Sequence, residues 1–319
     1  MRKIALEEHF TIHGYDHFGS EDSAADEVGG GFQRVVRNAL ADFGETRLQH
    51  MDASEIERAV LSLTIPGVHN RSDAHEALKL ARVANDFLAA EIAKRPDRYS
   101  GFAHLPLQNA TIAADELERC VRDLGFKGAM VHGHTAGRYL DEDAMSAFWE
   151  RVETLGVPVY LHVTDPVKRP AVLEGYPMLD GPLWGWMAET GAHVLRLIFS
   201  GMFDRYPGCK VIIGHMGEGL PFQLWRLDNW VNILFPGRRF KEPPSHYIRK
   251  NIYVTISGVC APEPLRYTID ALGKDHVLFA TDYPYESSEM HAQFIDSAPI
   301  SDDERRMVCY DNAANLLRI

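Results

Sequence analysis

Short runs of apolar residues recur along the chain and alternate with longer amphipathic segments. The short runs are rich in β-branched or aromatic residues and are bounded by glycine, proline or polar residues. This pattern is typical of strands that are buried on both faces of a parallel sheet. Eight runs are predicted to be strands: Lys3–Leu6, Ala59–Thr64, Ser100–Leu105, Gly128–Val131, Pro158–His162, Lys210–Gly214, Ile252–Ser257 and His276–Thr281.

Several of the intervening segments place apolar residues at the i, i+3, i+4 spacing of an amphipathic helix. The clearest are Ala74–Arg95, Thr111–Leu124, Asp143–Leu155 and Ser301–Leu317. Eight strand–helix alternations within 319 residues favour an α/β fold, a single (β/α)8 TIM barrel that forms one domain over 1–319. A doubly wound open sheet is the alternative. That fold usually has a glycine-rich phosphate turn after its first strand, and no GxGxxG follows the first run here.

Two insertions interrupt the alternation, one at Thr11–Phe32 and one at Pro221–Lys250. Both follow strands, so we expect both on the C-terminal face of the barrel, where substrate loops lie. The second insertion carries an apolar stripe that fits either a substrate loop or a contact with another copy of the chain. We therefore expect a homodimer or a homotetramer. The stripe consists of Leu224, Leu227, Val231 and Leu234.

Charge and cysteine usage narrow the partners and the compartment. The formal net charge of −12 argues against nucleic acid and against an anionic membrane surface, but allows a small anionic substrate at a locally positive site. No apolar stretch is long enough to span a bilayer, and the first residues do not form a signal peptide. The four cysteines show no CxxC spacing, which favours a reducing cytoplasm over a disulfide framework.

Four of the predicted strands lead into side chains that can bind a metal or move a proton: Glu7 and His9, His162, His215, and Asp282. In a barrel the C-terminal ends of all strands converge on one pocket. Because side chains alternate along a strand, Glu7 and His9 face the same side while Glu8 faces away. One ion could therefore be held by Glu7 and His9 of the first strand, with His162 and Asp282 completing the site.

This ligand set predicts one divalent ion, Zn²⁺ or Mn²⁺, at a site that keeps an open position for catalysis. A single histidine at a strand end is more often a hydrogen-bonded core residue, and Asp282 alone could cap a turn. The joint pattern is harder to explain by packing, because buried charges are costly unless they are paired or coordinated.

Three segments resemble the amidohydrolase superfamily, and more narrowly its non-hydrolytic decarboxylase branch. They are IALEEHF at the start, GHMGEGLPFQLWRLD from Gly214 to Asp228, and ATDYPYE from Ala280 to Glu286. That branch includes aminocarboxymuconate-semialdehyde, γ-resorcylate, 2,3-dihydroxybenzoate and 5-carboxyvanillate decarboxylases. The resemblance runs nearly end to end and is specific to the branch rather than to one member.

The resemblance implies a role for each matching residue. Glu7 and His9 match an E-x-H metal motif, where hydrolytic relatives usually have H-x-H, and His162 matches the metal ligand of the fifth strand. His215 matches an active-site histidine beside the metal, and Glu218 would hydrogen-bond it. Asp282 matches an aspartate that is both near-ligand and proton donor. Arg226 would help to bind the substrate.

The residues at the end of the fourth predicted strand differ between two types of decarboxylase within this branch. The chain has His132 where the γ-resorcylate type carries asparagine, while the HTAGRYLDE run that follows resembles the 5-carboxyvanillate type. That second type lacks the histidine that this chain keeps as His9. We expect His132 to contact the substrate. We also expect aromatic side chains to stack on the aromatic ring of the substrate. The candidates for stacking are Trp184 and Tyr285, with Phe18, Trp186 and Tyr283 as further possibilities.

These features predict a metal-dependent, non-oxidative decarboxylase of an ortho-hydroxylated aromatic carboxylate, with no organic cofactor. In this chemistry an acid protonates the ring carbon that carries the carboxylate, and loss of CO2 restores aromaticity. Asp282 is the proposed acid, with His215 tuning or delivering the proton and Glu218 orienting His215. The alternatives are a hydrolase of the same superfamily acting on a lactone or amide, and a metal-binding protein without activity.

Overall fold

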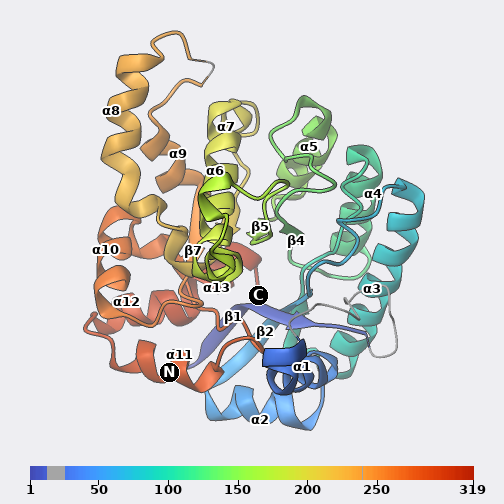
Figure 1. Cartoon of the computed structure of the whole chain (residues 1–319). Coiled ribbons are helices and arrows are strands. Elements are labelled where there is room, and N and C mark those ends of the chain that lie inside the picture. Colours follow the sequence, from blue (N-terminus) through green and yellow to red (C-terminus); the bar gives the residue numbers. More distant parts are fainter. Residues whose placement is uncertain (13–25, 239) are drawn as a thin grey trace.

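The protein is described by a computed structural model that covers residues 1–12, 26–238 and 240–319. Most of the first predicted insertion, including Phe18, lies outside these residues. Within them, eight parallel strands stand at the centre and helices surround them (Figure 1). The strands are β1 (Lys3–Phe10), β2 (Ile56–Leu63), β3 (Tyr99–Gly101), β4 (Ala129–His132), β5 (Val159–His162), β6 (Val211–Ile213), β7 (Ile252–Thr255) and β8 (Val277–Leu278).

Backbone contacts close the strands into a barrel. Regular pairing forms two sets of neighbouring strands, one in the order β1-β2-β3 and the other in the order β4-β5-β6-β7-β8. Parallel bridges then link Ala103 with Ala129 and Glu8 with Tyr283, and the Leu6 amide donates to the Phe279 carbonyl at 3.3 Å. The predicted (β/α)8 barrel is therefore confirmed, and the open-sheet alternative is wrong because a doubly wound sheet keeps two free edges.

The helices surround the barrel in chain order. The longer ones are α1 (Asp26–Ala41), α2 (Glu45–Ala53), α3 (Ala74–Lys94), α4 (Ala110–Arg122), α5 (Ser146–Leu155), α6 (Gly185–Phe199), α8 (Leu224–Leu234), α9 (Pro244–Asn251), α10 (Pro262–Leu272) and α11 (Ser288–Ser297). Short helices α7 (Met202–Arg205), α12 (Asp302–Arg306) and α13 (Asn312–Leu317) complete the set, with a π-helical turn at Met307–Asp311 between the last two.

The sequence located the strands well but not all of their ends. β1 continues four residues beyond the predicted Leu6, because its backbone pairs with β2 on one side and with Tyr283 on the other. The regular pairing of β3 and β8 ends earlier than predicted, at Gly101 and Leu278. Beyond these residues isolated backbone contacts continue, among them the Ala103–Ala129 bridge and the Leu6–Phe279 hydrogen bond. The predicted helix over Ser301–Leu317 is divided by the π-helical turn.

The core has two parts, as expected for a barrel with an outer layer of helices. Side chains such as Leu6, Met130 and Tyr160 fill the barrel interior, and α13 closes that cluster with Ala313 and Leu317. A larger cluster packs the outer faces of the strands against the helices. Because both faces of the sheet are buried, the strands read as continuous apolar runs in the sequence.

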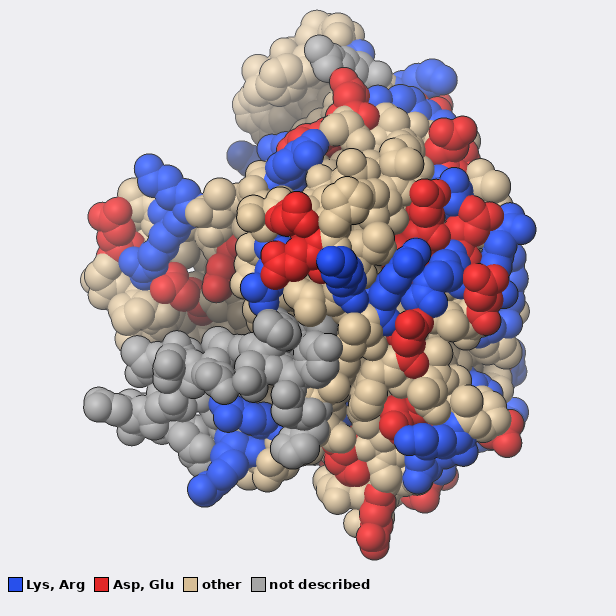
Figure 2. Space-filling view, turned by 90° about the vertical axis from the view of Figure 1, so that its right-hand side faces the viewer, with Lys and Arg blue, Asp and Glu red and all other residues tan. Residues whose placement is uncertain are grey.

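Two outer surfaces differ in character. Over the face shown in Figure 2, basic and acidic side chains are intermixed. Helix α8, within the second predicted insertion, projects away from the barrel in Figure 1 and exposes large apolar side chains, among them Trp225, Ile233 and Leu234. Among the described residues, no helix combines the length and apolar character needed to cross a bilayer.

Candidate metal centre

Glu7, His9, His162 and Asp282 converge above the C-terminal ends of β1, β5 and β8. One ligand atom from each lies within 4.8 Å of those of the other three. Within the cluster, His9 Nε2 lies 3.1 Å from Asp282 Oδ1, and His162 Nε2 lies 3.5 Å from Glu7 Oε1. The structure thus brings together the four residues that the sequence nominated.

An irregularity in β1 helps to aim these side chains. Ala5 pairs with Ala59 and Glu8 with Leu61, so β1 has one more residue than β2 over this stretch. Such a bulge re-aims side chains locally and is common beside active sites. Glu8 points away from the cluster, as predicted, and accepts hydrogen bonds from the Thr281 amide and hydroxyl at 3.0 Å.

Neighbouring polar groups fix the orientation of the cluster residues. The hydroxyl of Ser257 donates to Glu7 Oε2, and that of Thr255 does so at 3.4 Å. His162 Nδ1 lies 3.1 Å from the Val163 carbonyl, which can only accept, so Nδ1 carries the proton and Nε2 presents its lone pair to the cluster. This is the usual outer arrangement around a metal-bound histidine.

The protonation states also suit a cation. Burial lowers the pKa of both His9 and His162 to about 4, so both rings are neutral near pH 7. Burial opposes the charged form of Glu7, but His215 and His162 hold the pKa of its carboxyl below the ordinary value. Neutral imidazoles and an ionised carboxylate are the forms that bind metals.

Three polar atoms of the cluster, Glu7 Oε1, His9 Nε2 and Asp282 Oδ1, are buried without a hydrogen-bond partner. A buried polar atom without a partner costs free energy, typically about 1–3 kcal/mol. Three such atoms converging from β1 and the loop after β8 are readily explained by an ion that they share. The donor set therefore fits a divalent metal ion.

His215 lies next to this cluster in a strained turn. His215, Met216 and Glu218 all have positive φ, which side chains other than glycine rarely adopt. The turn places His215 Nδ1 2.7 Å from Glu218 Oε1. Although burial lowers the pKa of His215, the negative charges of Glu7 and Glu218 raise it to about 10, so the ring is a cation at neutral pH. Burial, with the charge of Glu7, raises the pKa of Asp282 to about 7.

Gly258 provides a structural test of the position of His215. A Cβ at Gly258 would lie 2.7 Å from His215 Cδ2, and its φ is +67°. We expect Gly258→Ala to displace the imidazole and to lower kcat by roughly 10-fold or more, since small misplacements of catalytic groups are costly. Steady-state kinetics together with metal analysis would measure this.

The matched control is Gly125→Ala. Gly125 has a similar φ of +73°, but apart from its chain neighbours no atom lies within 4 Å of the point that a Cβ would occupy. It therefore carries the same backbone strain without the clash. Equal loss of kcat in both variants would show that strain, rather than contact with His215, is responsible.

The predicted substrate contacts are placed unequally. The Tyr285 ring lies 5.7 Å from the ring of His9, and its hydroxyl hydrogen-bonds Thr64. The His132 ring lies 5.1 Å from that of His162. Both residues therefore border the cluster, and their roles in substrate binding stay predictions.

Arg226 and Trp184 lie on the exterior of the single chain. Arg226 is exposed on α8, with its guanidinium 5.9 Å from the centroid of the Trp230 ring. Trp184 is 51% exposed before α6. Of the other aromatic candidates, Trp186 donates to Asp165, and the Tyr283 ring packs on the guanidinium of Arg47. Contact of Arg226 or Trp184 with substrate stays a prediction.

Sequence reasoning missed a second group of buried histidines. His69 and His104 lie close to His132, and one nitrogen of each is within 4.8 Å of those of the other two. His104 lies near the end of the third predicted strand, and His69 lies a few residues beyond the second. The search for polar side chains at the ends of predicted strands identified His162 and His215. Applied to the third predicted strand, the same search would have identified His104.

Comparisons with known proteins agree with this geometry. The profile of the amidohydrolase family matches residues 41–319. The chain belongs to the amidohydrolase family. Within the family, it is 41% identical over 330 aligned positions to γ-resorcylate decarboxylase of Rhodococcus jostii, with 99% of this chain and 98% of that protein covered.

Two solved structures of amidohydrolase relatives have nearly the same fold. One is a dihydroxybenzoic acid decarboxylase from Polaromonas with bound manganese and the inhibitor 2-nitroresorcinol (39% identity, TM-score 0.89, 99% of this chain and 97% of that one). The other is 5-carboxyvanillate decarboxylase from Sphingomonas paucimobilis (36% identity, TM-score 0.91, 100% and 99%). The resemblance inferred from the sequence motifs is thus confirmed.

Proposed function

We propose that the chain is a metal-dependent, non-oxidative decarboxylase of an ortho-hydroxylated aromatic carboxylate of the dihydroxybenzoate or carboxyvanillate class. The observation that carries the proposal is the buried Glu7–His9–His162–Asp282 cluster beside a cationic His215. Relatives over the full chain length are named as decarboxylases of such acids, which supports the same assignment.

Glu7, His9, His162 and Asp282 would hold one divalent ion, Mn²⁺ or Zn²⁺. When bound, the ion supplies positive charge that orients an anionic aromatic acid and stabilises its oxygens. Manganese is present in a relative that is 39% identical, which favours Mn²⁺ as the first ion to test. The proposed reaction needs no organic cofactor, because the proton and the charge stabilisation both come from this site.

The protein side chains would manage the proton. The Asp282 carboxyl would donate a proton, shared with His215 or stabilised by the bound anion, to the ring carbon that bears the carboxylate. The new C–H bond forms, the bond to the carboxylate carbon breaks, and its electron pair returns to the ring as CO2 leaves. The cationic His215 would restore or share this proton, and Glu218 would orient it.

A direct assay tests the proposal. The protein loaded with Mn²⁺ or Zn²⁺ would be incubated with a panel of ortho-hydroxybenzoates, including 2,6-dihydroxybenzoate and 5-carboxyvanillate. CO2 release and loss of the substrate absorbance are the expected results. The hydrolase alternative predicts cleavage of lactones or amides instead. No turnover of any acid on the panel, together with such cleavage, would overturn the decarboxylase assignment.

Glu218 gives a graded test of the His215 pair. Glu218→Gln keeps an acceptor for His215 Nδ1 but removes one of the two charges, those of Glu7 and Glu218, that raise the pKa of His215. We expect activity to fall about 10–100-fold, as for other residues that orient an active-site histidine. The alkaline limb of the pH–rate profile should also move to lower pH, because His215 then loses its proton more easily. If the alkaline limb of the pH–rate profile did not move, the protonation of His215 would not be what controls that limb.

The exposed apolar residues of α8 support a homodimer or homotetramer. Six large side chains on or beside this helix are more than 40% exposed: Phe222, Trp225, Trp230, Ile233, Leu234 and Phe235. A patch of this size is typical of a protein–protein contact. Four free cysteines fit the predicted cytoplasmic location, and a small aromatic acid is the proposed partner.

A further inference from the structure

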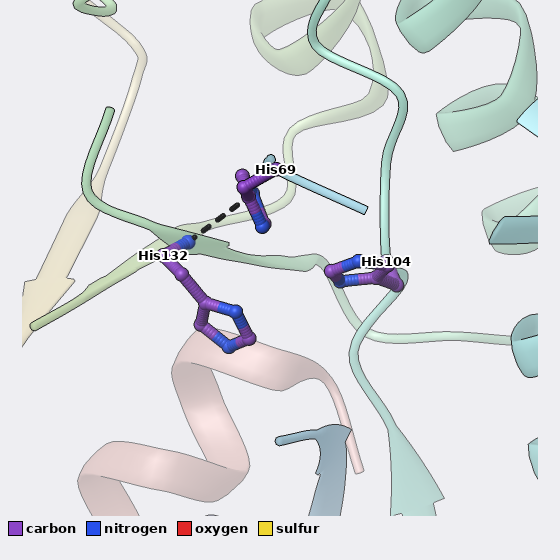
Figure 3. Close-up of side chains that lie close together, drawn as sticks. All are labelled: His69, His104 and His132. Atoms are coloured by element: carbon purple, nitrogen blue, oxygen red, sulfur yellow. Dashed lines mark hydrogen bonds between the residues drawn. The ribbon is translucent and has the colours of Figure 1, made fainter. Parts of the chain in front are cut away.

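His69, His104 and His132 form a compact group on the β2–β4 side of the barrel mouth (Figure 3). They come from the loop after β2, the segment after β3 and the end of β4. The ring centroids are 5.0 Å apart for His69 and His104, 5.0 Å for His69 and His132, and 5.6 Å for His104 and His132. None of the three residues is more than 6% exposed.

Hydrogen bonds show where the lone pairs of this histidine triad lie. His69 Nδ1 is 3.2 Å from the Pro66 carbonyl, so it donates there and Nε2 carries the lone pair. The main partner of that lone pair is the His132 amide, at a long 3.4 Å (dashed in Figure 3). Both ring nitrogens of His132 are buried without a partner. A neutral imidazole in this position leaves one lone pair and one N–H unsatisfied.

The surroundings are shaped to hold His104 in the triad. Asn85 binds its backbone on both sides, donating to the His104 carbonyl at 3.0 Å and accepting from its amide at 2.9 Å. Gly67 makes room for the ring, because a Cβ there would lie 2.3 Å from His104 Nε2. An apolar residue would fill this space without leaving polar atoms unsatisfied, so packing alone does not account for three imidazoles.

We propose that His69, His104 and His132 bind a second divalent cation, of the zinc type. Three neutral histidines are a known ligand set for Zn²⁺, with a fourth position left to water or hydroxide. All-nitrogen donors favour zinc over manganese, which prefers oxygen ligands. The triad shares no residue with the Glu7–His9–His162–Asp282 cluster, so the two sites can be emptied separately.

Two costs oppose an ion at the triad. His104 Nε2 accepts the Val68 amide at 2.9 Å and His69 Nε2 accepts the His132 amide at 3.4 Å, and coordination through these two nitrogens would displace both bonds. A neutral hydrogen bond contributes far less than the affinity of zinc for a preformed protein site. The second cost is charge: the triad has no carboxylate, so three neutral imidazoles leave the charge of the ion uncompensated. Hydroxide at the fourth position would offset part of that charge, and zinc promotes its formation near neutral pH.

Metal content measured after separate loading tests the proposal. The full chain would be stripped, loaded with Zn²⁺ alone or Mn²⁺ alone, desalted, and analysed for metal and protein. We expect about one ion per chain more with zinc than with manganese, because only zinc should occupy both sites. His104→Ala and His69→Gln should lower the zinc content to the manganese level and leave the manganese content unchanged.

Two further variants separate this site from the proposed active site. Glu7→Gln should lose the manganese ion yet keep one zinc ion. His193→Gln, at a buried histidine on α6 outside both clusters, should keep the full zinc content. The readout does not depend on catalysis, so it stands whether or not the decarboxylase proposal holds.

Equal zinc and manganese contents in the unaltered chain would overturn the proposal. So would an unchanged zinc content in both triad variants. If those variants fail to fold, the comparison of the two metals on the unaltered chain still decides the question. Loading with Co²⁺ adds a spectroscopic check, since tetrahedral coordination by nitrogen gives a visible absorption that a site rich in oxygen ligands does not.

Discussion

Replacing Asp282 by asparagine is expected to lower kcat by about 10²–10⁴-fold, the range for loss of a general acid or base. The amide keeps the shape and one oxygen of the side chain but cannot deliver a proton. Its oxygen can still face the cation, so metal content should remain near that of the unaltered chain. Turnover of the best acid from the substrate panel and elemental analysis would be measured on the same preparation.

A matched control distinguishes the acid role from a general effect on the barrel mouth. Asp165 lies in the loop after β5 and accepts a hydrogen bond from the Trp186 indole at 2.7 Å. Asp165→Asn changes the same functional group near the pocket but outside the cluster, and we expect it to retain activity. Retained activity in Asp282→Asn would refute the proton-donor role and would shift that role to His215.

The barrel and the composition of the candidate metal cluster were predictable from sequence for a topological reason. Parallel strands of a barrel all end at one rim, so residues at the ends of different strands meet whatever their separation in sequence. Glu7, His162 and Asp282 could be grouped on this basis alone. The orientation of the cluster side chains was not predictable, because it depends on the bulge in β1 and on the hydrogen bonds that Ser257 and Thr255 donate to Glu7.

The histidine triad shows where strand-end reasoning is too narrow. His132 was noticed because it ends a predicted strand, whereas His69 lies in a loop whose path the sequence does not specify. The ring of His104 fits only because Gly67 leaves space beside it. Contacts of this kind join loops through tertiary packing, and hydrophobic periodicity carries no information about them.

Arg226 shows a different limit. The apolar stripe that the sequence showed within the second insertion lies on α8 (Leu224–Leu234), where Leu224 and Val231 are buried within the chain and Leu234 is exposed. Periodicity does not tell where the polar face of the helix points. In the single chain Arg226 stacks on Trp230 at an exposed surface, so any contact with substrate depends on how that surface is covered.

Replacing Glu7 by glutamine is expected to abolish most metal binding at the first cluster and to lower activity on the order of 10²–10³-fold. The loss follows from removing the carboxylate of the cluster whose pKa is held below the ordinary value, whereas that of Asp282 is raised to about 7; Glu7 therefore supplies most of the charge that offsets the cation in this buried site. Glu7 is fully buried, so water cannot substitute for its charge. Metal content would be measured directly, and binding would be followed by the metal-dependent rise in Tm. A ligand at 100 times its Kd stabilises a fold by about 2.7 kcal/mol.

The adjacent residue supplies the control. Glu8→Gln is the same chemical change one position along β1, at a side chain that is also buried but bonds Thr281 instead of facing the cluster. Burial raises the pKa of Glu8 to about 8, so the native group is largely a neutral acid at pH 7 and the amide replaces it closely. Glu8→Gln should therefore keep the metal-dependent Tm shift that Glu7→Gln loses. If both variants lost the shift equally, the strand rather than the ligand would be responsible, because alternation along β1 would no longer separate the two residues.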